Sequence, residues 1–185
     1  MQVTSYNLHN PVFGPAEDLF FRGVDGAQNF IYRINLDGTG LRKVIPHALI
    51  ELEGVSPDAR WVLVREGVSA QQTSHGVQAY PVEGGTPVPI CLSWCHLNWA
   101  ADGKFLYLRD VLNRDKVFAI PLQHGEVFPP LPSSGLKSDQ DVMQIPGTRV
   151  ISTPETGDIA FASNPSIYAF DRPRVRRNLY RIPVP

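Results

Sequence analysis

The chain has 185 residues, of which 43% are hydrophobic and 10% aromatic, enough apolar material for one packed domain. Seventeen basic against eighteen acidic residues leave a net charge of −1, so the cationic excess of nucleic-acid-binding proteins is missing and no nucleic-acid partner is expected. No run approaches the about 18 apolar residues of a membrane span, and the N-terminus lacks the pattern of a signal peptide.

Short apolar runs separated by chain-breaking residues dominate the sequence. Fifteen glycines and seventeen prolines lie between these runs, and amphipathic helical periodicity is almost absent. Most runs are rich in β-branched and aromatic residues, which fit a half-buried pleated surface. In chain order, the predicted strands are 19–22, 30–36, 61–65, 105–109, 117–122, 159–162 and 179–184.

A polar turn followed by an apolar strand recurs along the chain. Residues 56–64 align with residues 100–108, which lie 44 positions later, and weaker copies occupy 15–21 and 155–161. Asp102-Gly103 supplies the backbone freedom that a hairpin turn needs. A period of about 40 to 45 residues is typical of four-stranded propeller blades.

A second repeated unit follows each of these copies. Residues 32–38 match 78–84 and 118–124, and a last copy ends the chain at 180–184. Pro81 and Pro121 fall inside strand-like runs. Proline cannot donate to a ladder, so these two should lie at an edge or at an unpaired position.

These repeats predict an all-β, propeller-like array of about four antiparallel, four-stranded blades, which is a partial propeller unless four blades close a ring. A blade buries its faces only against its neighbours, so one blade alone should not be stable. The expected blades are 10–48, 49–92, 93–135 and 136–185.

The turn motif resembles that of a known family. Ser56-Pro57-Asp58-Ala59-Arg60-Trp61-Val62 is similar to the motif of Tol-type, WD-repeat-like propellers, and residues 32–40 resemble that family's following strand and turn. The part from Cys91 to Pro183 is similar to propeller regions appended to bacterial serine/threonine protein kinases. Ala100-Ala101 departs from the family's Ser-Pro, and only about four blades are countable.

The resemblance implies a protein-interaction or sensing module without catalysis of its own, bound to a protein partner and needing no cofactor. The alternative is an accessory domain of a separate or missing serine/threonine kinase or serine peptidase domain. The sequence holds no kinase motifs, and residues 67–71 lack the second glycine of a nucleophile elbow. Self-association to complete a ring is a further expectation. The chain should be cytoplasmic if complete, whereas in a larger, membrane-anchored protein the rest would set its compartment.

Few residues stand out as interaction candidates. Trp94, near a blade boundary, is interpreted first as a structural residue; if it is exposed, it is the first candidate for recognition, because tryptophan is enriched in binding hot spots. Arg172, Arg174 and Arg176 form the densest basic cluster, which is interpreted first as a solvated loop and second as a partner contact.

Two further segments leave alternatives open. Cys91 and Cys95 would lie about 13 Å apart in an extended strand, so free thiols are favoured, with a disulfide if the segment turns and a metal site as the third option. Residues 128–135 are rich in proline and are interpreted as a stiff crossover between blades, with a polyproline ligand as the alternative.

Overall fold

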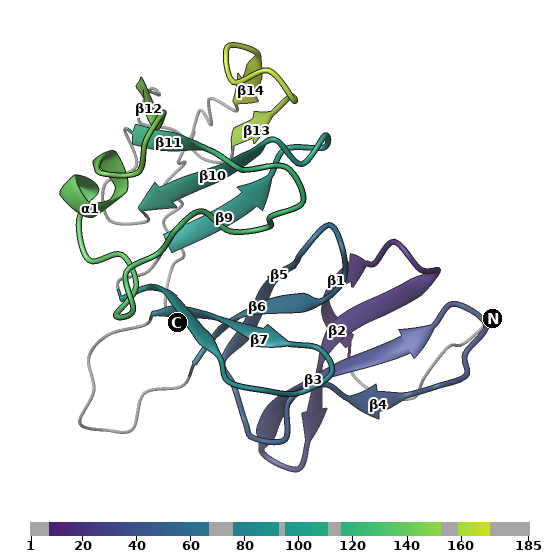
Figure 1. The fold of residues 1–185 in the computed structure, drawn as a ribbon. Coiled ribbons are helices and arrows are strands. Elements are labelled where there is room, and N and C mark those ends of the chain that lie inside the picture. Colours follow the sequence, from purple (N-terminus) through teal and green to yellow (C-terminus); the bar gives the residue numbers. More distant parts are fainter. Residues whose placement is uncertain (1–7, 67–75, 93–94, 111–115, 153–158, 171–185) are drawn as a thin grey trace, which may run out of the picture.

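The computed structural model describes residues 8–66, 76–92, 95–110, 116–152 and 159–170. Strands make up nearly all of its regular structure (Figure 1), with one short helix, α1 (Asp139–Met143). The strands are β1 (Leu8–Phe13), β2 (Asp18–Asp25), β3 (Gln28–Asn35), β4 (Arg42–Lys43), β5 (Glu51–Val55), β6 (Trp61–Arg65), β7 (Val77–Pro81), β8 (Val88–Cys91), β9 (Cys95–Trp99), β10 (Phe105–Asp110), β11 (Lys116–Pro121), β12 (Arg149–Ser152), β13 (Ile159–Phe161) and β14 (Tyr168–Phe170).

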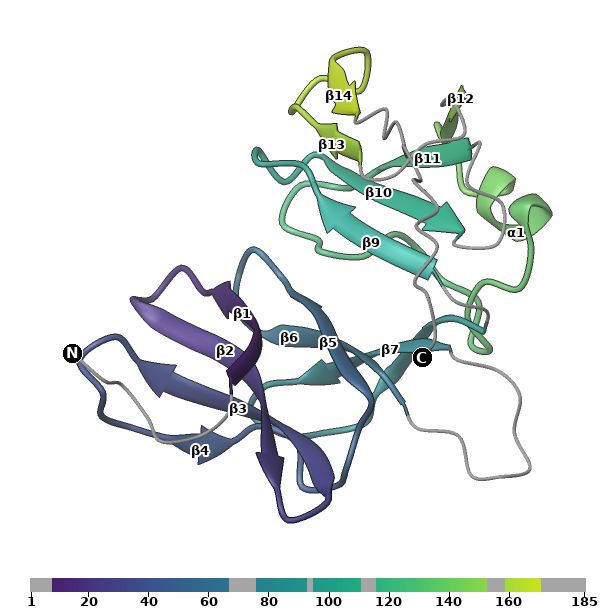
Figure 2. The ribbon, with the colours of Figure 1, turned by 180° about the vertical axis from the view of Figure 1, so that it is seen from behind.

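These strands form three four-stranded antiparallel sheets and one antiparallel hairpin. Blade 1 is β1–β4, blade 2 is β5–β8 and blade 3 is β9–β12, each with its strands in sequence order, and β13 pairs with β14. The first strands of successive blades contact one another, β1 with β5 and β5 with β9. Figures 1 and 2 show the sheets following one another along the molecule, so the predicted all-β architecture is confirmed.

The repeat alignment is confirmed by the strand register. Asn35, Pro81 and Pro121, which the alignment makes equivalent, each pair with the first residue of the preceding strand. Pro81 and Pro121 end their strands, beyond the last residues that pair with the fourth strands of blades 2 and 3. Each proline therefore sits where no ladder bond to the fourth strand is needed.

Apolar side chains between neighbouring sheets build the core. One cluster joins blades 1 and 2, including Phe20, Ile31 and Val62, none of which is exposed. A second cluster joins blades 2 and 3, and a third joins blade 3 to the β13–β14 hairpin. Burial of this kind is shared between sheets, as the repeat architecture predicts.

Residues 128–135 do not cross from one blade to the next. They lie inside blade 3, between its third strand and its fourth strand at Arg149–Ser152, so the expected boundary at 135 falls within an insertion. We call residues 122–138 the strap. It runs back to blade 2, where Leu136 and Cys91 form a parallel bridge, and it leads into α1, capped by Ser138.

The expectation of free thiols is wrong. Cys91 and Cys95 form a disulfide, with their Cα atoms 6.5 Å apart. The estimate of 13 Å assumed one continuous strand, whereas Cys91 ends β8 and Cys95 begins β9, so the chain changes blade between them. The two cysteines thus link the last strand of blade 2 to the first strand of blade 3.

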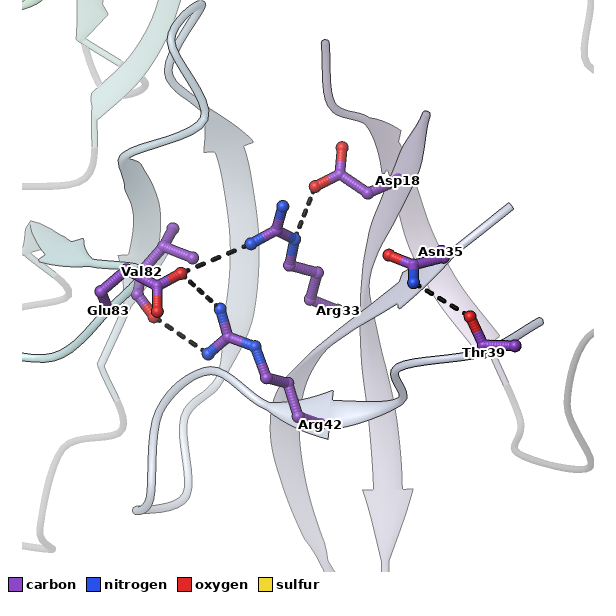
Figure 3. Close-up of polar contacts among 7 residues, drawn as sticks. All are labelled: Asp18, Arg33, Asn35, Thr39, Arg42, Val82 and Glu83. Atoms are coloured by element: carbon purple, nitrogen blue, oxygen red, sulfur yellow. Dashed lines mark hydrogen bonds and ion pairs between the residues drawn. The ribbon is translucent and has the colours of Figure 1, made fainter. Parts of the chain in front are cut away.

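A polar joint connects blade 1 to the end of β7 in blade 2 (Figure 3). Arg33 of β3 donates to the buried Asp18 at 2.6 Å and lies 3.5 Å from Oε1 of Glu83. Arg42 of β4 donates to the same Glu83 oxygen at 2.6 Å and to the carbonyl of Val82 at 3.3 Å. The two guanidinium groups therefore hold the turn after β7 against β3 and β4 of blade 1.

Candidate functional site

The turns from first to second strand, and from third to fourth, lie at one end of the sheets, which we call the turn face. Two adjoining cavities of about 690 and 430 Å³ open there beside blades 2 and 3. Both sizes fall within the range of ligand-binding clefts. We call them together the turn-face groove, lined by Pro57, Asp58, Ala59, Arg60, Trp61, Pro81, Glu83, Trp99, Asp102, Gly103, Lys104, Leu122, Gln123, His124, Gly125, Glu126, Val127 and Phe128.

Three half-buried aromatic side chains form the floor of the groove. Phe128 of the strap meets Trp61 edge-on, with ring centroids 5.6 Å apart, and lies 5.9 Å from the ring of Trp99. The Trp99 indole N–H donates to the carbonyl of Val127 at 2.8 Å, which fixes the strap at this point. Large aromatic surfaces that are packed but not fully covered are the commonest anchors of protein interfaces.

Two turns with the same chemistry line the larger cavity of the groove. Asp58 accepts from Ser56 Oγ at 2.5 Å and pairs with Arg60 at 2.6 Å, and Asp102 pairs with Lys104 at 3.2 Å. Partial burial raises the pKa of Asp58, but the hydrogen bonds from Ser56 and Arg60 outweigh it and hold the pKa below its usual value. Both aspartates therefore carry charge at neutral pH and keep their turns closed.

A second polar site lies where the first strands of the blades meet. Glu51 and Glu53 of β5 both pair with Arg65 of β6. Asn10 of β1 donates to Glu51 at 2.6 Å, and His96 Nδ1 of β9 lies 3.2 Å from Glu53. The network spans three blades, and a cavity of about 240 Å³ adjoins it. Its charges satisfy one another, as buried charges must, so a joining role accounts for it.

Arg65 of this network belongs to a repeat that the sequence analysis did not use. Arg22, Arg65 and Arg109 each stand at the fifth position of the second strand of a blade. Arg22 donates to the carbonyl of Ile50, just before β5 of the next blade, at 3.0 Å. Arg65 instead pairs with glutamates of its own blade. Three of the predicted strand runs end in these arginines, so the signal was present in the sequence.

The interaction residues predicted from sequence, Trp94, Arg172, Arg174 and Arg176, all lie outside the described residues. Trp61 and Trp99, which the sequence analysis did not single out, pack against the core and also line the groove. Within the described ranges, no group of three or more His, Cys, Asp or Glu side chains could hold a metal ion. Nor is any described helix long and apolar enough to cross a membrane.

The sheet order, the shared cores and the repeated turns define a Tol-type, β-propeller-like fold. TolB from Acinetobacter baumannii superimposes with a TM-score of 0.50 at 18% identity, covering 72% of this chain and 36% of that one. At this identity the likeness concerns the fold alone. This chain spans little more than a third of that TolB.

Weaker matches belong to other propeller proteins. A protein assigned as TolB from Agrobacterium tumefaciens gives a TM-score of 0.48 at 17% identity over 66% of this chain and 45% of that one. A chain of a nidogen–laminin complex gives 0.45 at 17% identity over 65% and 46%. No family model matches the sequence, and no curated protein sequence matches it.

Proposed function

We propose that this chain is a non-catalytic interaction module that binds a segment of a protein partner in the turn-face groove. The observation that carries the proposal is the half-buried floor of Trp61, Phe128 and Trp99 beneath an open groove. A segment laid there would cover apolar rings and meet charged side chains at the rim, which is the usual composition of an interface.

The architecture supports this choice of surface. The groove is built by rigid parts, namely the ends of two sheets and a strap that is fixed at both Val127 and Leu136. A surface held in this way loses little conformational freedom on binding, which favours affinity. The network around Arg65, by contrast, uses its charged groups on one another.

Selection of binders from a random peptide library, displayed on phage and panned against the whole chain, tests the proposal. A bulky maleimide attached to Gln123→Cys would fill the groove, and the same label on Gln28→Cys provides the control. Both glutamines are exposed, and Gln28 lies at the opposite end of the sheets. The selected peptides should lose binding only to the protein labelled at position 123. Binding that survives that label would overturn the assignment of the groove.

The alternative, an accessory domain of a serine/threonine kinase or serine peptidase, places a catalytic domain on the same chain or in the same complex. A kinase or peptidase domain encoded next to this segment would favour this alternative. The compartment is a separate question. Disulfides persist in oxidising compartments, so the Cys91–Cys95 link favours an extracytoplasmic site of action over the cytoplasmic one.

A further inference from the structure

The charges around the turn-face groove are unevenly matched. Four carboxylates and two cationic side chains line it. Arg60 is held by Asp58 and Lys104 by Asp102, each within its own turn. The other two carboxylates belong to Glu83 and Glu126, and both line the smaller cavity. Arg33 and Arg42 of blade 1 approach Glu83 from one side, and Glu126 lies close enough to Arg60 for a Coulombic interaction.

These two carboxylates have room for another cation. Arg33 and Arg42 both approach Oε1 of Glu83, and the Glu83 side chain is 79% exposed. Among the described residues, Glu126 has no ion-pair partner within 4 Å, and it lies on the exposed surface of the strap. A further cation could approach the second carboxylate oxygen of Glu83 and the carboxylate of Glu126 without displacing an existing ion pair.

The apolar surface below these carboxylates also suits a basic side chain. Trp61 and Phe128 meet at 81°, so their rings form two walls of a corner, which Pro81 and Ala59 extend with apolar surface. Aromatic faces attract ammonium and guanidinium groups, and the aliphatic stems of lysine and arginine cover apolar surface. This protein already uses such a contact, because Lys43 Nζ lies 3.6 Å from the centroid of Phe30.

We propose that the smaller cavity of the turn-face groove is a specificity pocket for an arginine or lysine side chain of the partner. The inference rests on the proposed function and adds the chemistry of the residue that is recognised. The stem of the guest lies in the corner of Trp61 and Phe128, and its charged head lies between Glu83 and Glu126.

Small analogues of these side chains test the pocket directly. The whole chain, labelled with ¹⁵N, is titrated with butylguanidinium, with butylammonium and with the neutral isostere butylurea, and the indole N–H resonance of Trp61 is followed by NMR. The Trp61→Phe variant assigns that resonance. The two cations should shift it at least about fivefold more strongly than butylurea at equal concentration.

Matched variants locate the charge. Glu126→Gln should weaken binding of butylguanidinium about fivefold, whereas Glu17→Gln, also exposed and on the turn face, should leave it unchanged. Equal shifts from butylurea and butylguanidinium, or no effect of Glu126→Gln, would overturn the proposal. If the selected peptides need the groove but not their basic residues, this inference fails and the proposed function stands. If no peptide binds the groove, the proposed function fails.

Discussion

At the scale of single residues, charge on a turn aspartate governs part of the stability. Asp58 has a pKa below its ordinary value of 3.8 in the folded chain, so the stability it contributes is present above that value and is lost as the pH falls through the folded pKa. Asp58→Asn should therefore lower the unfolding free energy by about 1.5 kcal/mol at pH 7, the lower end of the range for hydrogen bonds to a charged group. Urea denaturation measures this loss. The difference from the natural chain should shrink as the pH falls below 3.8, and a difference that does not change with pH would contradict this account.

Backbone strain at the same turn offers a second test. Ala59 has φ of 55°, and its equivalent in blade 3, Gly103, has φ of 70° with open space where a Cβ would stand. A left-handed conformation costs a residue with a Cβ roughly 1 kcal/mol. Gly103→Ala should thus lower stability by about 1 kcal/mol, and Ala59→Gly should raise it by a smaller amount, since glycine also loosens the unfolded chain. Chemical denaturation of both variants measures the two changes in unfolding free energy. Changes of the same sign would contradict the proposed backbone strain.

At the scale of elements, the disulfide links β8 to β9 and closes a very short loop. The chain-entropy model gives about 2 kcal/mol for a loop of this size. Replacing both cysteines by alanine should cost that amount, and adding a reductant should cost the natural chain the same but leave the double variant unchanged. Thermal unfolding with and without reductant measures both effects. If the reductant also lowers the stability of the double variant, its effect does not come from the Cys91–Cys95 disulfide.

The strands that sequence could and could not predict differ in burial. The second strand of each blade and the third strands of blades 1 and 3 were predicted directly, because runs such as Trp61–Arg65 are covered on both faces and read as continuous apolar segments. The third strand of blade 2, β7, was found only through the repeat. The first and fourth strands were not predicted. β5 alternates Glu51 and Glu53 with Leu52, and β4 is only Arg42–Lys43, so neither carries an apolar run.

The groove was missed for a related reason. Trp61 lies in a predicted strand, but its partner Phe128 belongs to the strap, whose course depends on contacts far along the chain. Leu136 pairs with Cys91 across 45 positions, and no local pattern announces such a bridge. The repeat could thus predict the blades and the turns around Asp58 and Asp102, whereas the groove requires the insertion to be placed.

At the scale of the whole molecule, each blade should depend for its stability on the neighbouring blades, because neighbours share the apolar clusters. Phe20 is fully buried between blades 1 and 2, and Phe118 between blades 2 and 3. Removing a buried phenylalanine ring costs about 3–5 kcal/mol. In a chain of sheets that contact only their neighbours, that loss should be concentrated beside the cavity.

Hydrogen exchange measured by mass spectrometry on two matched variants tests this expectation. Phe20→Ala should speed exchange in β2, β3, β6 and β7, with a smaller effect in β10 and β11. Phe118→Ala should reverse the order, affecting β6, β7, β10 and β11 more than β2 and β3. If both variants speed exchange equally in every sheet, the sheets unfold as one cooperative unit. The core would then behave as that of a single globular domain rather than as a series of stacked blades.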